Sequence, residues 1–278
     1  MSPQRIAHLG PRATNTEAAA ARFDPEAELI PVANVAAAVQ AVERGEADLA
    51  MVAAENAIDG AVRETLDQLI RSDLELQVAA ELVLPIRHVL VGAPGIDPRA
   101  AERVYSHPQA LAQCREHLRE LAPHAAHVAA LSTTAGIEAA IAEVGALGVG
   151  PPIAAEFYGG EVYADDIGDI PHNVTRFLVL GADDHAPTGD DKTSLAFTTE
   201  HDRSGSLVEV LELFSTRAVN LTHIESRPTR EQLGTYVFLV DIQGHRRDEG
   251  VAEALEAARG VTSWFRVLGS YPRWTAEA

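Results

Sequence analysis

Short apolar runs alternate with longer amphipathic ones along residues 1–180. The short runs have the length of β-strands, and the longer ones space their apolar residues as α-helices do. The expected strands are Arg5–Leu9, Leu29–Val32, Leu49–Val52, Val104–Ser106, Val128–Leu131 and Ala146–Val149. The expected helices are Glu17–Phe23, Val35–Glu43, Val62–Arg71, Gln109–Leu121 and Gly136–Val144. This alternation predicts an α/β fold with largely parallel sheets.

One apolar stretch is longer than the others. It covers residues 76–91 and is interrupted by Pro85. We expect the chain to cross there from one lobe to a second and to return over residues 173–180. Residues 1–181 then form two lobes with a cleft between them, a common place for a small ligand.

The last third of the chain has a different order of elements. Residues 182–191 are polar, contain glycine and proline and lack apolar periodicity, which predicts a linker. Residues 192–278 predict a βαββαβ domain, an order typical of ferredoxin-like folds. Its expected strands are Thr193–Thr198, Leu221–Pro228, Thr235–Ile242 and Val261–Gly269, and its expected helices are Ser206–Arg217 and Asp248–Arg259.

Charge narrows the choice of partners. The 278 residues include 22 Lys and Arg against 41 Asp and Glu, a net charge of −19. Such a surface repels nucleic acids and anionic membranes, so neither is expected as a partner. Lys192 is the only lysine, a composition that either a GC-rich genome or adaptation to high salt predicts.

The cysteine content and the distribution of apolar residues indicate the compartment. A single cysteine, Cys114, excludes an internal disulfide framework and a multi-cysteine zinc site. No run approaches the roughly 18 apolar residues of a membrane span, and the first residues lack the apolar segment of a secretory signal. We therefore expect a cytoplasmic protein without a metal or cofactor.

Two of the expected helices begin beside hydroxyl residues. Thr14 and Glu17 have the spacing of a capping box, and Thr133 and Thr134 stand with Ser132 at the second start. Both starts can be ordinary helix caps. If they face one cleft, their free N–H groups and helix dipoles suit a ligand with two carboxylates.

Two further segments carry polar side chains near the expected cleft. Glu55 and Asn56 follow a strand, where they can present a carboxylate and an amide to a ligand or simply form an Asx turn. Thr175 and Arg176 lie at the return crossing. A hydroxyl and a guanidinium there suit a carboxylate. A structural salt bridge of Arg176 that never touches a ligand is the equal alternative.

Five segments together resemble the prephenate dehydratase family. They are residues 10–16 (Gly-Pro-Arg-Ala-Thr-Asn-Thr), 53–60 (Ala-Ala-Glu-Asn-Ala-Ile-Asp-Gly), 106–114 (Ser-His-Pro-Gln-Ala-Leu-Ala-Gln-Cys), 133–135 (Thr-Thr-Ala) and 173–177 (Asn-Val-Thr-Arg-Phe). The last contains a Thr-Arg-Phe motif whose threonine is the catalytic residue in that family.

This resemblance implies a two-lobed catalytic domain, similar to type II periplasmic binding proteins, over residues 1–181. The reaction it implies is the decarboxylating dehydration of prephenate to phenylpyruvate in phenylalanine biosynthesis. Thr175 is the catalytic residue that it implies. The substrate-binding residues that it implies are Thr14, Glu55, Asn56, Thr133, Thr134, Asn173, Arg176 and Phe177.

The C-terminal unit, residues 192–278, resembles an ACT domain of the phenylalanine-sensing kind. The effector-binding residues that this resemblance implies are Gly205, Ser206, Leu207, Asn220, Leu221, Glu225, Ser226, Arg227 and Pro228. In the family these segments form a phenylalanine site at an interface between subunits. The resemblance therefore implies allosteric regulation by phenylalanine in a homodimer or homotetramer.

The chain departs from the family pattern at several positions. The family's glycine before Thr14 is Ala13, the aromatic residue after it is Asn15, and the serine after Asn56 is Ala57. A Cβ at residue 13 restricts a positive φ, and Ala57 removes one hydroxyl donor. Two other functions stay open: a non-catalytic sensor of small acids, and a decarboxylase that acts on prephenate without forming an aromatic ring.

Overall fold

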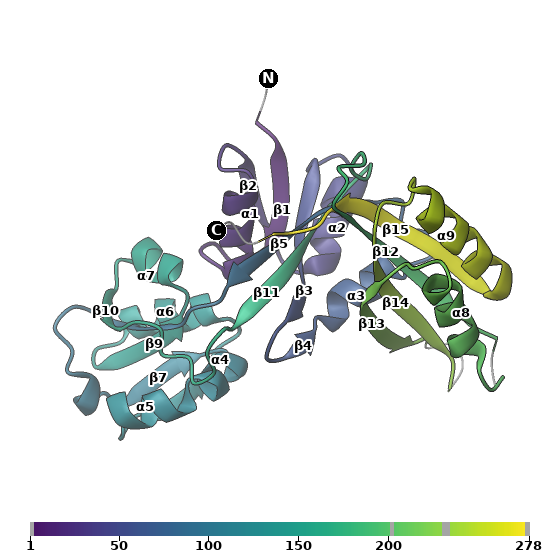
Figure 1. Cartoon of the computed structure of the whole chain (residues 1–278). Helices are drawn as coiled ribbons and strands as arrows, with labels where there is room; N and C mark the ends of the chain where they lie inside the picture. Colours follow the sequence, from purple (N-terminus) through teal and green to yellow (C-terminus); the bar gives the residue numbers. More distant parts are fainter. Residues whose placement is uncertain (1–2, 201–202, 230–233, 276–278) are drawn as a thin grey trace.

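The computed structural model describes residues 3–200, 203–229 and 234–275. Two α/β lobes come first along the chain, and a C-terminal domain follows them (Figure 1). Over the described ranges, no helix combines the length and the apolar character needed to cross a membrane.

The first lobe is built on a sheet with the strand order β2-β1-β3-β11-β5, and the short strand β4 pairs with β3. Strands β1, β2 and β3 run parallel, whereas β11 is antiparallel to both β3 and β5. The strands are β1 (Arg5–Leu9), β2 (Glu28–Val32), β3 (Leu49–Asn56), β4 (Gly60–Ala61), β5 (Gln77–Pro85) and β11 (Val174–Gly181), and the helices are α1 (Asn15–Phe23), α2 (Val35–Glu43) and α3 (Arg63–Leu69).

The second lobe has a sheet with the order β10-β6-β9-β7-β8. Its strands are β6 (Val89–Gly92), β7 (Arg103–Ser106), β8 (Ala126–Ala129), β9 (Ala146–Gly150) and β10 (Glu161–Ala164). Its helices are η1 (Pro98–Ala100, a 3₁₀ turn), α4 (Pro108–Gln113), α5 (Arg115–Leu121), α6 (Thr133–Ala142) and α7 (Pro152–Tyr158). Strands β7, β8 and β9 are parallel, and β6 and β10 are antiparallel to their neighbours.

The predicted mixed α/β class is confirmed, but the expectation of largely parallel sheets is wrong near the crossings. The chain leaves the first lobe through β5 and returns through β11, so these adjacent strands must run in opposite directions (Figure 1). In the second lobe, β6 and β10 occupy the same entering and leaving positions, and both are antiparallel.

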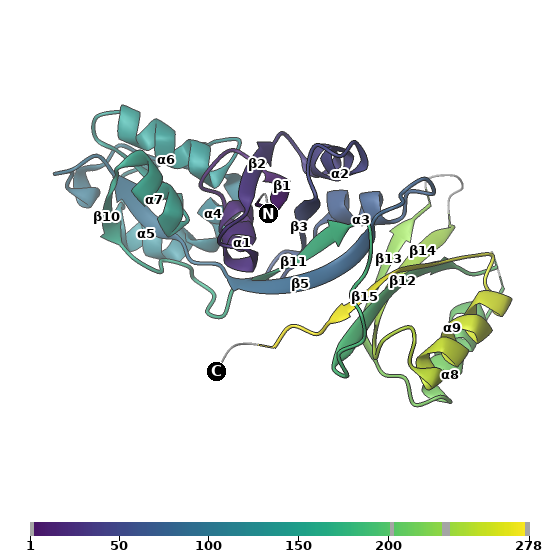
Figure 2. The same cartoon turned by 90° about the horizontal axis from the view of Figure 1, so that it is seen from above.

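The C-terminal domain has the predicted ferredoxin-like βαββαβ order. Its sheet order is β13-β14-β12-β15, with every pairing antiparallel. Its strands are β12 (Asp191–Thr198), β13 (Leu221–Pro228), β14 (Tyr236–Gln243) and β15 (Trp264–Pro272). Helices α8 (Ser206–Ser215) and α9 (Glu249–Val261) cover the outer face of this sheet, and its other face is turned toward the first lobe (Figure 2).

Some helix boundaries differ from those expected. The helix expected over residues 109–121 is two helices, α4 and α5, which meet at the fully buried Cys114. Helix α6 begins three residues earlier than expected because Ser132 caps it, with Ser132 Oγ accepting from the Ala135 amide at 3.0 Å. Helix α7 and strand β10 are further elements that the sequence pattern did not predict.

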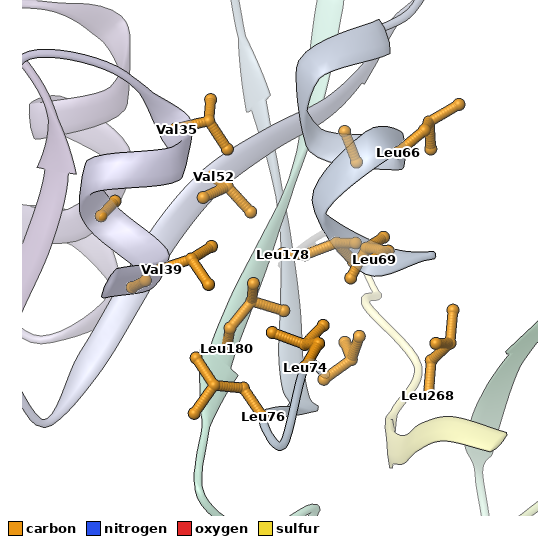
Figure 3. Packing of buried hydrophobic residues seen from close by; sticks show 14 of the residues in the cluster. Val35, Val39, Val52, Leu66, Leu69, Leu74, Leu76, Leu178, Leu180 and Leu268 are labelled. Carbon is orange, nitrogen blue, oxygen red and sulfur yellow. The ribbon is translucent and has the colours of Figure 1, made fainter. Parts of the chain in front are cut away.

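The first lobe and the C-terminal domain share one hydrophobic core. Side chains of α2, α3 and β11 gather beside Leu268 of β15 (Figure 3). Leu178 and Leu180 of β11 belong to this cluster. One face of β11 therefore lies in the contact between the first lobe and the C-terminal domain.

Gly269 allows β15 to approach β5 closely. A Cβ at this position would lie 2.3 Å from the Val78 carbonyl oxygen and 2.7 Å from the Val78 nitrogen. Both are backbone atoms, which cannot move aside as a flexible side chain can. The φ of Gly269 is +151°, a conformation that other residues rarely adopt.

We expect Gly269→Ala to lower the free energy of unfolding by about 2 kcal/mol, because the added methyl group forces β15 away from β5. Gly260→Ala is the matched control, since a Cβ there meets no atom within 4 Å and α9 gains helix propensity. Urea denaturation measures both. Equal stability of the two variants would contradict the close packing of β15 on β5.

Candidate active site

Thr175 and Asn56 form the centre of a hydrogen-bonded cluster between the two lobes. They are paired in register, Thr175 near the start of β11 and Asn56 at the end of β3. Thr175 is 8% exposed. Asn56 Nδ2 donates a hydrogen bond to Thr175 Oγ1 at 3.0 Å. One lone pair of the threonine oxygen is therefore occupied by the amide.

The orientation of the Asn56 amide is fixed by its own oxygen. Asn56 Oδ1 accepts from the Ile58 amide at 3.0 Å and from the Asp59 amide at 3.1 Å. The Asx turn that the sequence left as an alternative is thus present, and it serves the site. Because the oxygen faces these two N–H groups, the amide nitrogen must face Thr175.

The cluster continues into the second lobe through Asn173. Asn173 Oδ1 accepts from Asn56 Nδ2 at 2.8 Å, and Asn173 Nδ2 donates to Gln113 Oε1 at 3.2 Å. Gln113, at the end of α4, also donates to Asp59 Oδ2 at 2.5 Å. Gln113 is not among the expected site residues, although it lies in one of the five segments that carry the family resemblance.

His88 supports Gln113 from the start of the second lobe. His88 Nε2 lies 2.9 Å from Gln113 Oε1. Since Gln113 Nε2 donates to Asp59, Gln113 Oε1 is the acceptor and His88 Nε2 carries the proton. Burial lowers the pKa of His88 from its ordinary 6.5, against the opposite effects of the Gln113 hydrogen bond and of Asp166 and Asp59. His88 is therefore neutral at pH 7.

The two hydroxyl-bearing helix starts are genuine caps that lie side by side across the lobes. Thr14 Oγ1 accepts from the Glu17 amide at 3.2 Å and donates to the Leu9 carbonyl at 3.1 Å. Thr134 Oγ1 donates to the Ala13 carbonyl at 3.3 Å, from α6 to the loop before α1. The hydroxyls of Thr14 and Thr134 are thus bound within the protein. Thr133 is the first residue of α6 and is half-buried.

Ala13 adopts the conformation that its family glycine suggests. Its φ is +63°, in the left-handed region where a Cβ is unfavourable. Its side chain is 1% exposed and packs into the apolar cluster of the second lobe that contains Val89 and Ile137. The added methyl group therefore does not prevent the positive φ, and it contributes a contact between the lobes.

Phe177 is in the hydrophobic core, so the sequence-based expectation that it binds substrate is wrong. Its side chain is 1% exposed and packs with Ile6 and Met51 in the cluster beneath α1. A side chain this buried offers no surface to a ligand. Its role is to anchor β11 in the sheet.

Arg176 and Glu55 face the C-terminal domain, whereas the family resemblance implies that they hold substrate. They pair in register on β11 and β3, on the opposite face from Thr175 and Asn56, because successive strand residues alternate between faces. Arg176 donates to Asp241 of β14, and Glu55 lies 3.7 Å from His223 of β13. For Arg176 the contacts favour the structural salt bridge over a carboxylate ligand.

The expected effector residues are divided between the two ends of the C-terminal sheet. The segments 205–207 and 225–228 lie at the end where Thr198, Val237 and Arg227 are in register. Ser206 Oγ there donates to Thr199 Oγ1 at 3.2 Å. Asn220 and Leu221 lie at the opposite end, beside Gln243 and Ile242.

Arg227 differs from the other expected effector residues because its guanidinium is bound by the first lobe. It forms an ion pair with Asp67 of α3, and its side chain is only 13% exposed. Arg227 therefore joins the C-terminal domain to the first lobe.

Comparison with known proteins identifies the family. The sequence model of the prephenate dehydratase family matches residues 6–185, and that of the ACT domain matches residues 193–260. A prephenate dehydratase of Corynebacterium glutamicum is 37% identical over 285 residues, which cover 99% of this chain and 90% of that protein. A bifunctional chorismate mutase/prephenate dehydratase of Aquifex aeolicus is 40% identical over 271 residues, which cover 97% and 74%.

A solved structure agrees with these sequence matches. The structure of a prephenate dehydratase from Arthrobacter aurescens in complex with L-Phe has a TM-score of 0.89 at 38% identity, and the match covers 97% of this chain and 90% of that one. Fold and site define a two-lobed α/β lyase with a C-terminal ACT domain. The chain belongs to the prephenate dehydratase family, whose reaction is the decarboxylating dehydration of prephenate to phenylpyruvate.

The neutral state of His88 makes the stability of the protein depend on pH. The folded pKa lies below the unfolded value of 6.5, so the unfolded chain binds more protons as the pH falls. The contribution of neutral His88 to the free energy of unfolding is present above pH 6.5. It is lost below pH 6.5, by at most about 1.4 kcal/mol per pH unit for one proton.

We expect His88→Gln to lose less unfolding free energy than the wild type between pH 7.5 and pH 5.5, as measured by urea denaturation. His127→Gln is the control, because it makes the same substitution at an exposed position of β8. An identical pH dependence in His88→Gln and the wild type would show that His88 is not held neutral.

Proposed function

We propose that Thr175 donates the hydrogen bond that assists departure of the ring hydroxyl of prephenate. The observation that carries this proposal is the direction of the Asn56 hydrogen bond: the amide donates to Thr175 Oγ1, so the hydroxyl proton is left to point elsewhere. Within the described ranges, no acceptor is bonded to this hydroxyl. Thr175 is therefore a prepared donor at the junction of the lobes.

The reaction requires little beyond orientation and one proton. Loss of carbon dioxide and the ring hydroxyl creates an aromatic ring, so the driving force lies in the substrate. As the carbon–oxygen bond breaks, negative charge develops on the departing oxygen, and a donor fixed at that point stabilises the transition state. The neutral amides of Asn56, Asn173 and Gln113 keep the donor in place without adding negative charge.

The adjacent helix starts support a place for the substrate carboxylates. Helices α1 and α6 meet across the lobes where Thr134 donates to the Ala13 carbonyl, so their positive ends converge. We assign Thr14, Thr133 and Thr134 to this region through their helix N-termini rather than through their hydroxyls. The attraction of these helix ends for carboxylates acts at short range only, because the net charge of −19 repels a dianion at a distance.

We expect Thr175→Ala to lower kcat by a factor of about 10²–10³, since it removes the donor. Asn56→Asp should cause a loss of similar size, because a carboxylate accepts the Thr175 proton instead of donating to its oxygen. Formation of phenylpyruvate, followed by ultraviolet absorbance, measures both rates. Asn34→Asp is the matched control, since residue 34 only caps α2 and aspartate caps equally well.

Three results would reject this assignment. If Thr175→Ala retained wild-type kcat in a folded protein, another group would be the donor. If the wild type consumed prephenate and formed a non-aromatic product, the decarboxylase alternative would hold. Binding of prephenate without turnover would instead favour the sensor.

We further propose that phenylalanine binds between two copies of this chain in the cytoplasm. The two ends of β13 carry different effector segments, about 20 Å apart at roughly 3.3 Å per residue, so one chain does not bring them together. An antiparallel, twofold pairing of ACT domains places Asn220 of one copy beside Gly205 of the other. Strand β13 is an edge strand of the ACT sheet. Ile224 on β13 and Val208 on α8 are exposed, at 46% and 55%.

We expect Ile224→Lys to lower the mass measured by sedimentation velocity and to abolish the effect of phenylalanine on the rate, while the basal rate is kept. Val144→Lys is the control, because Val144 is fully exposed on the second lobe. A protein with Ile224→Lys that keeps both its mass and its phenylalanine response would contradict a site formed at this edge.

A further inference from the structure

Arg176 lies in the contact between the first lobe and the ACT domain. Its Nε donates to Glu81 Oε2 at 2.7 Å, its Nη1 to Asp241 Oδ2 at 2.6 Å, and its Nη2 to Tyr271 Oη at 2.8 Å. Glu81 is on β5, whereas Asp241 and Tyr271 are on β14 and β15 of the ACT domain. The side chains of Arg176 and Glu81 are 15% and 1% exposed. A planar guanidinium bound at three nitrogens is held in one orientation.

Lys192 balances the charge of this junction cluster, which consists of Arg176, Glu81, Lys192, Asp241 and Tyr271. Its Nζ lies 2.7 Å and 2.8 Å from the two carboxylate oxygens of Glu81. Two cations therefore meet two carboxylates. The only lysine of the chain thus forms an ion pair with Glu81 from the ACT side.

A second layer of contacts saturates the acceptors in the cluster. Ser194 Oγ donates to the second oxygen of Asp241 at 2.5 Å and lies 2.6 Å from Tyr271 Oη. The Trp274 amide donates to Glu81 at 3.0 Å. Burial raises the pKa of Tyr271 well above its ordinary range, and the Asp241 charge acts in the same direction, so the phenol keeps its proton.

The contact between the first lobe and the ACT domain does not depend on these charged side chains alone. Apolar packing around Leu268 already joins the two domains (Figure 3), and a buried ion cluster adds little stability over apolar side chains of similar volume. The cluster instead fixes the position and the orientation of the planar Arg176 guanidinium, because its hydrogen bonds are directional.

Arg176 is connected to Thr175 of the candidate active site by one peptide bond, so its orientation affects the position of Thr175. Thr175 precedes it on β11 and faces the opposite side of the sheet. The β11–β3 pairing shifts register directly after Arg176, so the regular ladder is interrupted at this point. Such irregularities re-aim neighbouring side chains, and a fixed guanidinium limits that freedom.

We propose that Arg176 is a positioning residue for the reaction: held by Asp241 and Tyr271 of the ACT domain and by Glu81, it sets the position of the Thr175 hydroxyl. The ACT sheet is then part of the support of the active site, in addition to any role in sensing an effector. This inference rests on the proposed role of Thr175 as the donor.

Tyr271→Phe and Asp241→Asn in the full-length protein test this. The first removes one hydrogen bond to Arg176 without changing charge. The second replaces a carboxylate oxygen with an NH₂ group, which cannot accept from both Arg176 and Ser194. We expect kcat to fall by about tenfold in Asp241→Asn and less in Tyr271→Phe, because a displaced donor stabilises the transition state poorly. KM should stay within about twofold of wild type in both.

Arg266→Gln is the matched control. Arg266 of β15 also crosses from the ACT domain to the first lobe, but it donates to the carbonyls of Arg71 and Leu74, in the segment after α3 and not to residues of β11. Its loss weakens the same domain contact and should leave kcat unchanged. Thermal unfolding of all three variants confirms that folded protein is compared.

Three results would overturn the proposal. They are an unchanged kcat in folded Asp241→Asn, an equal loss of kcat in Arg266→Gln, and a rise in KM at constant kcat, which would mean that Arg176 contacts substrate. A failure of the donor assignment is distinguishable from these, since it is seen in Thr175→Ala, which would then keep its activity whatever Asp241→Asn does.

Discussion

The site depends on the direction of one hydrogen bond, from the Asn56 amide to the Thr175 hydroxyl. An amide that donates leaves the threonine proton for a ligand, whereas a carboxylate at residue 56 would consume it. The Asx turn at Ile58 and Asp59 fixes that direction, and Asn173 and Gln113 extend it across the lobes. In the proposed mechanism, a weak acid becomes a useful donor because its geometry is prepared before substrate binds.

Strand β11 connects this donor to the rest of the molecule through its two faces. Thr175 and Phe177 face the α1 side, where Phe177 anchors the strand, and Arg176 and Leu178 face the ACT domain. The same alternation that places Thr175 on one side of the strand gives the strand a second side that the ACT domain holds. In a chain of net charge −19, two of the 22 lysines and arginines, Arg176 and Lys192, lie at this junction.

The sequence predicted the features that depend on residues close together in the chain. The capped starts of α1 and α6, the βαββαβ order and the motif around Thr175 followed from periodicity, capping residues and family resemblance. The opposite faces of Thr175 and Arg176 were also predictable from strand alternation, and the motif obscured this by presenting the two as one unit. Gln113 and the partners of Arg176 were not predictable, because they come from segments whose approach depends on how lobes and domains pack.

A structure of the protein bound to a dihydro analogue of prephenate, which cannot become aromatic, tests the account most directly. We expect Thr175 Oγ1 within hydrogen-bond distance of the analogue's ring hydroxyl, with Asn56 Nδ2 still donating to Thr175 and Arg176 still bound to Asp241. A ring hydroxyl that meets a different donor, with the Thr175 proton directed to a main-chain carbonyl, would contradict the account.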